Sequence, residues 1–373
     1  MLTVPVPIPE ATSSANEYLL LSNVFWSLDQ MLWIALPLIF VASGAGKLVA
    51  NTLEKKVGVG AISIFLYSLT YFAIDRVVRS PIKYFWGKAY AAKIQEPAPS
   101  FVQWLPAQLL DWMIFFLMAS ALTVLAYFLI KKFGSKWWVA AALITIILSS
   151  AYLLFEPYTQ TNRPLVQTGV EQVVAKTAAL SKIPASQIRV ENCNPVGSCP
   201  PGRVIGLGPT RIMVMNEGFM LNNPERHTVQ TVAHESKHFS SDDNLKAVIL
   251  ISLSSIAFFY LLSIGGRRLS RKLHPSEDSS RASARDIPVY IFVASVLFIF
   301  LSPPINFIRR SVELSADIYS LNLTKDCEAQ ATMLAEYTKS NNRVADPGRF
   351  YTIFRDSHPS DARRIQIANE CIN

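Results

Sequence analysis

Long apolar stretches alternate with polar segments along much of this chain. A membrane-spanning helix needs about 20 apolar residues, and the stretches of that length and character are roughly 29–46, 60–78, 105–130, 137–155, 246–265 and 287–304. Two polar stretches remain, 156–244 and 305–373, and the last two apolar stretches stand between them. The pattern predicts a polytopic membrane protein with about six transmembrane helices, whose water-soluble domain is divided in the sequence.

The polar stretches show both helical and strand periodicity. Apolar residues between Leu165 and Leu180 recur at helical spacing. Short apolar runs at 188–190, 203–205 and 211–215 predict strands, and a turn-rich segment joins the last two. Asn222-Asn223-Pro224 is a start signal for a following helix. The sequence therefore predicts a mainly α-helical fold with a small β-sheet in the water-soluble domain.

Composition agrees with a membrane protein. The chain is 51% hydrophobic and 17% charged, which is too apolar for two soluble domains. Its formal charge of +8 comes mostly from basic residues beside apolar stretches, where they contact lipid headgroups. This placement predicts a lipid bilayer as a partner and no nucleic-acid binding. The first 30 residues contain no Lys or Arg, unlike a cleaved signal peptide, so we expect this segment to be retained.

The segment from Thr231 to Phe239 carries the strongest chemical signal. On a helix, His234 and His238 project from one face, where their imidazoles can bind one zinc ion per chain. Glu235 then lies beside that ion and can take the proton of an attacking water molecule. The H-E-x-x-H pattern is typical of zinc peptidases. The alternative is a chance match on an ordinary amphipathic helix.

Two histidines alone hold zinc poorly, so a third protein ligand is expected. Glu313 is the candidate, because helical spacing places it on one face with Arg310 and Asp317. Asp317 could accept the free ring N–H of a ligand histidine and fix its tautomer. From the spacing alone, the alternative is an exposed ladder of opposite charges.

These motifs together carry a family resemblance. The order H-E-x-x-H at 234–238, a pair of membrane helices, and E-x-x-A-D at 313–317 resembles the integral-membrane zinc metalloendopeptidases that include the type 1 CAAX prenyl protease and HtpX. Residues 206–212 resemble the strand–turn–strand that precedes the zinc helix in that family. The S-H-P at 357–359, followed by Arg364, resembles the family's C-terminal element. The resemblance implies a zincin-like catalytic domain.

The resemblance also implies roles for the matching residues. It implies that His234, His238 and Glu313 are the zinc ligands and that Glu235 is the general base. It places Asp317 beside these ligands and makes Arg364 an internal ion-pair partner in the Asp317 region, and helical spacing adds Arg310 to the residues expected around the centre.

Substrate contacts are implied in the same way. His358 would face the oxyanion or the substrate backbone. An extended peptide would pair with a strand edge made of Val204, Ile205, Gly206 and Leu207. The chain departs from the family pattern just before this edge, where Pro201 and Gly202 stand in place of the usual Asn and Ala.

These patterns divide the chain into four expected parts. We expect an N-terminal membrane region with four transmembrane helices at 1–155, the first catalytic part at 156–244, a helix pair with a basic loop at 245–304, and the second catalytic part at 305–373. The predicted function is zinc-dependent hydrolysis of peptide bonds in membrane or exported polypeptides. The alternatives are a CAAX-type prenyl-protein endopeptidase, a non-catalytic scaffold or chaperone, and a transporter.

The distribution of basic residues predicts the orientation. The loops at 46–60, 131–136 and 265–286 lie on one side of a six-span layout and are rich in Lys and Arg, whereas the N-terminal segment has none. The positive-inside rule then places these loops in the cytoplasm. The catalytic domain is therefore expected on the outer side of a bacterial plasma membrane. The basic loop at 76–104 disagrees, and the resemblance implies a cytosolic domain.

Four cysteines bear on the same question. Cys193, Cys199, Cys327 and Cys371 all fall outside the apolar stretches, and their even number suggests disulfides in an oxidising compartment. Proximity suggests Cys193 with Cys199, which leaves Cys327 with Cys371. The alternative is unpaired thiols.

Overall fold

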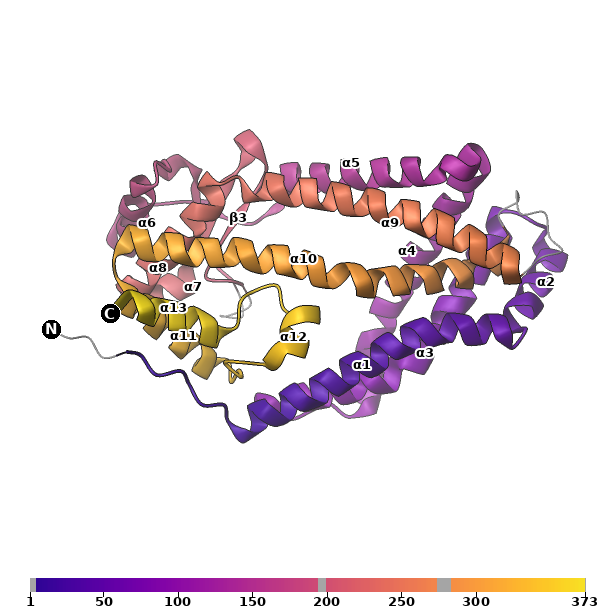
Figure 1. The fold of residues 1–373 in the computed structure, drawn as a ribbon, viewed down its shortest axis with the longest axis horizontal. Helices are drawn as coiled ribbons and strands as arrows, with labels where there is room; N and C mark the ends of the chain where they lie inside the picture. The colour runs from indigo at the N-terminus through magenta and orange to yellow at the C-terminus, as the bar shows by residue number, and fades with distance from the viewer. Residues whose placement is uncertain (1–4, 194–198, 274–282, 373) are drawn as a thin grey trace. The chain divides into compact units, whose positions relative to one another are not determined.

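The computed structural model describes residues 5–193, 199–273 and 283–372 (Figure 1). These residues divide into two compact units. The helical unit comprises Ser13–Thr145 and Leu253–Ser302. The sheet-containing unit comprises the segment ending at Thr12 together with Ile146–Ser252 and the chain from Pro303 onward. Helices α5, α9 and α10 each contribute residues to both units.

The α-helices and strands have the following bounds. The helices are α1 Ser13–Ala42, α2 Ala45–Val57, α3 Ala61–Lys93, α4 Phe101–Phe133, α5 Trp137–Thr159, α6 Gly169–Leu180, α7 Glu217–Asn222, α8 Glu225–Ser240, α9 Asp243–Leu273, α10 Ile287–Thr324, α11 Cys327–Ser340, α12 Gly348–Phe354 and α13 Asp361–Ile372. The strands are β1 Arg163–Pro164, β2 Ile188–Glu191, β3 Gly202–Ile205 and β4 Ile212–Asn216.

Five helical stretches in the described residues are long and apolar enough to cross a membrane, so the protein is a multi-pass membrane protein. One of them, Phe101–Thr159, contains α4, a short 3-10 turn and α5. Its 59 residues would extend for almost 90 Å as one helix, about three times the thickness of a bilayer core. The helix breaks at Gly134, whose positive φ of 54° favours glycine. The spans expected at 105–130 and 137–155 therefore lie in separate helices.

Two parts of the helical unit differ from the sequence expectation. The first apolar stretch ends at Ala42 rather than near residue 46, because Gly44 adopts a φ of 75° and starts the unexpected helix α2. Helix α9 continues to Leu273, so the first part of the expected basic loop is helical. Residues 274–282 of that loop lie outside the described residues.

Helices α9 and α10 run side by side in the helical unit (Figure 1). Leu262 of α9 is buried and packs in one cluster with Tyr290 and Val293 of α10. A Cβ at Gly266 would lie 2.3 Å from the Tyr290 ring. A glycine at this position therefore lets the two helices approach closely.

The sheet has the strand order β1-β2-β4-β3. Strands β2 and β4 are parallel, whereas β1 pairs with β2 and β3 pairs with β4 in antiparallel register. The three strands expected from the sequence are present, and the two-residue β1 was too short to predict. Because β3 pairs only with β4, it forms an edge of this described sheet.

A buried apolar cluster joins the sheet to its helices. Val174 of α6, Met213 and Met215 of β4, and Val232 and Phe239 of α8 all belong to it. The apolar residues of α8 lie on the face that packs here, and burial of each large side chain stabilises the unit by about 1.5–3 kcal/mol. This packing fixes the position of α8 relative to β3 and β4.

A second apolar cluster contains Leu321 of α10, Leu334 of α11 and Ile365 of α13. The N-terminal segment adds to it, because Val6 packs against the cluster. The backbone N–H and C=O of Val6 each lie 2.9 Å from the side-chain amide of Asn369, as donor and acceptor. The residues before α1 therefore belong to the sheet-containing unit and not to the helical one.

Candidate metal centre

Three potential metal ligands converge between α8 and α10. The Nε2 atoms of His234 and His238 lie 3.1 Å apart. The Glu313 carboxylate reaches them from α10, with its Oε2 atom 3.4 Å from His234 Nε2 and 3.8 Å from His238 Nε2. Their donor atoms all lie within 4.8 Å of one another. The structure thus brings together the three residues that the sequence pattern singled out.

The Nδ1 atom of each histidine contacts a carboxylate. His234 Nδ1 lies 3.1 Å from Asp317 Oδ1, and His238 Nδ1 lies 2.9 Å from Asp243 Oδ2. A carboxylate at Nδ1 accepts the ring proton there, so Nε2 of the neutral ring keeps a lone pair that faces Glu313. The sequence pattern predicted Asp317 here but did not single out Asp243 as a partner of His238. The position of Asp243, five residues after His238, was the sequence signal that could have indicated this contact.

Arg364 and Arg310 take different places around this centre. Arg364 of α13 donates two hydrogen bonds to Asp317, at 2.6 and 2.7 Å. Arg310 does not contact that group; it donates to the backbone carbonyls of Thr352 and Asp356, the latter at 2.7 Å. Arg364 therefore orients Asp317, whereas Arg310 holds the segment before His358.

His358 approaches the same carboxylate from a third direction. Its Nε2 atom lies 3.5 Å from Glu313 Oε2. Its backbone N–H donates to the Asp356 carboxylate at 3.1 Å, and its side chain is half exposed. This residue therefore stands at the solvent-exposed side of the centre.

The donor set fits a zinc ion. Two imidazole lone pairs 3.1 Å apart repel each other unless a cation lies among them. Burial of His234 disfavours its charged form, yet the Asp317 and Glu313 carboxylates raise its pKa to about 10. The surroundings thus favour a positive charge at this point. Tetrahedral zinc with bonds near 2.1 Å has ligand atoms about 3.4 Å apart, close to the separations here.

Glu235 lies beside the three ligands and is almost fully buried, with 8% of its surface exposed. Burial raises the pKa of Glu235, and the adjacent histidines oppose this increase. A Cβ at Gly202 would lie 2.9 Å from Glu235 Cγ. The departure from the family pattern at this position therefore has a physical reason, because glycine lets β3 pass against Glu235.

Among the described strands, β3 pairs only with β4, so no strand covers its other side. Asn216 N–H donates to the Pro201 carbonyl, and Ile205 pairs with Ile212 in the same register. Because partners alternate along an antiparallel ladder, the polar backbone atoms of Val204 point away from β4. The Asn244 side chain occupies part of this side by donating to the carbonyls of Val204 and Gly206, at 3.3 and 2.7 Å.

Gly206 and Leu207 lie in the turn that follows β3. Gly206 has a φ of 87°, and the Leu207 N–H donates to the Thr210 side chain at 3.2 Å. The extended edge therefore comprises Gly202–Ile205, and it is shorter at its C-terminal end than the sequence suggested.

This geometry distinguishes two proline substitutions. Val204→Pro removes an N–H on the free side of β3 and is expected to raise KM for peptides while metal content is retained. Ile205→Pro removes a donor to β4 and is expected to lower the melting temperature instead. Steady-state kinetics, metal analysis and thermal unfolding of both variants test this. Unchanged kinetics in folded Val204→Pro protein would place the peptide on another surface.

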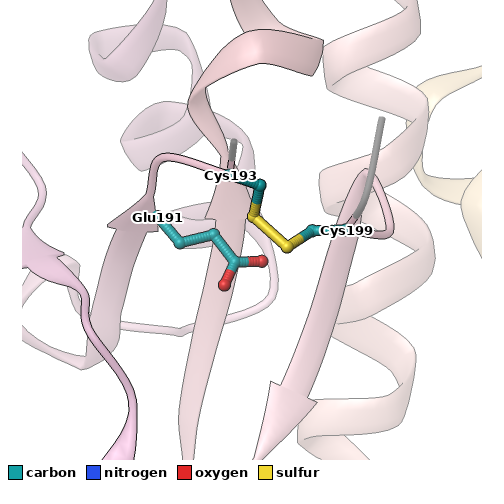
Figure 2. A group of neighbouring side chains, drawn as sticks. All are labelled: Glu191, Cys193 and Cys199. Atoms are coloured by element: carbon teal, nitrogen blue, oxygen red, sulfur yellow. A yellow bond between two sulfur atoms is a disulfide. The ribbon is translucent and has the colours of Figure 1, made fainter. Parts of the chain in front are cut away.

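The cysteines form two disulfides in the sheet-containing unit. Cys193 joins Cys199 beside the end of β2, and Cys327 joins Cys371, linking α11 to α13. Figure 2 shows Glu191 next to the first disulfide. Glu191 also forms an ion pair with Arg203 of β3. Because both sulfur atoms are bonded to each other, this group lacks the thiolates that a metal site would need.

The chain is similar to known proteins in sequence and in fold. The profile described as Peptidase family M48 matches residues 164–372. The chain is 23% identical over 371 residues to a Bacillus subtilis (strain 168) protein named uncharacterized metalloprotease YhfN, covering 97% of this chain and 86% of that protein. It also resembles the crystal structure of S. mikatae Ste24p with a TM-score of 0.73 at 14% identity, covering 97% of this chain and 91% of that one.

Proposed function

Because the chain belongs to peptidase family M48, we propose that this membrane metalloprotease is a zinc-dependent endopeptidase whose zinc ligands are His234, His238 and Glu313. The observation that carries the proposal is the convergence of these side chains beside the buried Glu235. The supporting carboxylates Asp317 and Asp243 fix the histidine tautomers that a metal requires.

The residues around the centre suggest a mechanism for peptide hydrolysis. A zinc ion held there supplies Lewis-acid chemistry, which polarises a carbonyl and makes a water molecule more acidic. Glu235 accepts the proton of the attacking water on its carboxylate. The raised pKa of Glu235 suits this role, since the acid can then return the proton to the leaving amine. His358 can donate a hydrogen bond to the oxyanion from the open side.

Strand β3 can hold the substrate in an extended conformation. Its free edge runs from Gly202 to Ile205, and Gly202 lies directly against Glu235. A peptide paired with this edge would have its backbone beside the general base. Backbone pairing depends little on the side chains of the bound peptide. A strand edge therefore suits polypeptide substrates of varied sequence.

A combined metal and activity measurement tests the proposed function. We expect the purified protein to contain one zinc ion per chain and to cleave a denatured membrane protein. Dialysis against a chelator should abolish cleavage, and added zinc should restore it. A chain that contains zinc but cleaves no polypeptide would favour the non-catalytic scaffold.

We also propose that the metal centre faces the outside of the cytoplasmic membrane. The N-terminal segment joins the sheet-containing unit through Val6 and Asn369, so both lie on the same side. The chain between them must therefore cross the membrane an even number of times. This supports two membrane crossings within Phe101–Thr159. The positive-inside rule then places the basic loops in the cytoplasm. Both disulfides belong to the sheet-containing unit, and an oxidising compartment outside the cytoplasm would preserve them.

Reporter fusions test this orientation. A reporter that is active only outside the cytoplasm, fused after Asn373, is expected to be active. A cytoplasmic reporter at the same position is expected to be silent. The opposite pair of results, together with reduced cysteines in cells, would instead place the centre in the cytosol.

A further inference from the structure

Charged residues are buried within the helical unit, far in sequence from the metal ligands. Asp29 of α1 and Asp75 and Arg79 of α3 are each less than 10% exposed. All three belong to helices that are long and apolar enough to span a membrane. Charged groups at such positions are costly and usually serve a function.

Most of this charge is paired. Arg79 donates two hydrogen bonds to Asp29, at 2.8 and 2.6 Å, and lies 3.5 Å from Asp75. Lys83 also reaches Asp29, at 3.3 Å. Two carboxylates thus pair with two cations, and the charges of these four side chains sum to zero.

Arg76 adds a positive charge that the group does not neutralise. Within the described residues, no carboxylate lies within ion-pair distance of Arg76, and its buried Nε has no hydrogen-bond partner. Its guanidinium lies 3.8 Å above the centre of the Phe115 ring. The guanidinium is therefore positioned by a cation–π contact, and its buried Nε donor is not satisfied.

Arg76 lines a cavity of about 290 Å³ within the helical unit. Asp29, Asp75 and Arg79 also line it, as do the aromatic side chains of Trp33, Tyr71 and Phe115. We propose that this cavity binds the phosphodiester of an anionic phospholipid. Arg76 holds the phosphate, and the aromatic side chains pack against the glycerol and the first part of the acyl chains.

The position of Arg76 favours a lipid over a free anion. Arg76 lies near the end of the apolar stretch 60–78, where a free hydrated ion is costly to bury, whereas a lipid phosphate is already held in the bilayer by its acyl chains. Two turns further along α3, Tyr84 packs edge-on against Phe101 and Trp104 of α4. Such aromatic clusters mark the level of the lipid headgroups. A lipid phosphate can thus reach Arg76 from this level.

Binding of defined probes to the full-length protein in detergent tests the proposal. Wild-type protein is expected to bind short-chain phosphatidylglycerol roughly tenfold or more tightly than Arg76→Gln protein does. Arg76→Lys should retain part of this affinity, because it keeps the charge. Lys88→Gln, which changes a more distant cation on the same helix, should bind like the wild type.

Inorganic phosphate and glycerophosphoglycerol, which lack acyl chains, are the matched probes. Both are expected to bind at least tenfold more weakly than the lipid. Equal binding of lipid and inorganic phosphate would overturn the lipid assignment, and equal lipid binding by wild type and Arg76→Gln would overturn the site. If Arg76→Gln does not fold, Phe115→Leu keeps the charge and must still weaken lipid binding severalfold, or the site is wrong.

Discussion

Replacing Glu235 by Gln is expected to leave zinc bound and to lower kcat by roughly 10²- to 10⁴-fold. Glutamine keeps the shape of the side chain and its contact with Gly202, but it cannot accept the proton of the attacking water. Since Glu235 is not one of the proposed ligands, the metal content should match that of the wild type.

Turnover of a peptide substrate and metal content measured on the same preparation check this prediction. Glu225→Gln is the matched control, because Glu225 is an exposed glutamate at the start of the same helix. Wild-type turnover in metallated Glu235→Gln protein would falsify the general-base role.

Replacing Glu313 by Ala is expected to weaken zinc affinity by more than the 10- to 100-fold typical of residues that only support a ligand. The change removes one of three protein donors and leaves His234 and His238 alone, and two histidines hold zinc poorly. Activity should fall with the metal content.

Glu217→Ala and Glu225→Ala are the controls for this loss. Glu217 lies outside the centre and pairs with Arg163 at 2.7 Å, and Glu225 is exposed. Metal analysis of the three variants after dialysis against a weak chelator measures the difference. Equal zinc content in all three would move the third ligand to another residue.

Local sequence patterns predicted much of the fold. The hydrophobic stretches, the strands and the helix that carries His234 and His238 all depend on periodicities of a few residues, and the structure confirms a mainly α-helical membrane protein with a small sheet. Helical spacing likewise set Glu313 and Asp317 on one face of α10. These relations hold within one element, so they can be read without knowing the packing.

Contacts between distant elements could not be obtained in this way. Neither the approach of Gly202 to Glu235 nor the contact of Asn244 with β3 has a local signature. The attachment of Val6 to Asn369 joins opposite ends of the chain. The helix break at Gly44 was missed because a glycine at the end of an apolar stretch does not by itself specify a positive φ.

The divided sheet-containing unit sets the order in which the centre is completed during synthesis on the ribosome. His234 and His238 emerge together, but roughly 75 residues that include α9 must follow before Glu313. At about 5–20 residues per second this takes several seconds. Arg364 and the Cys371 partner of Cys327 come later still. A nascent chain thus passes through membrane insertion before the proposed set of ligands is complete, and we expect this order to protect the chain and its neighbours from premature cleavage.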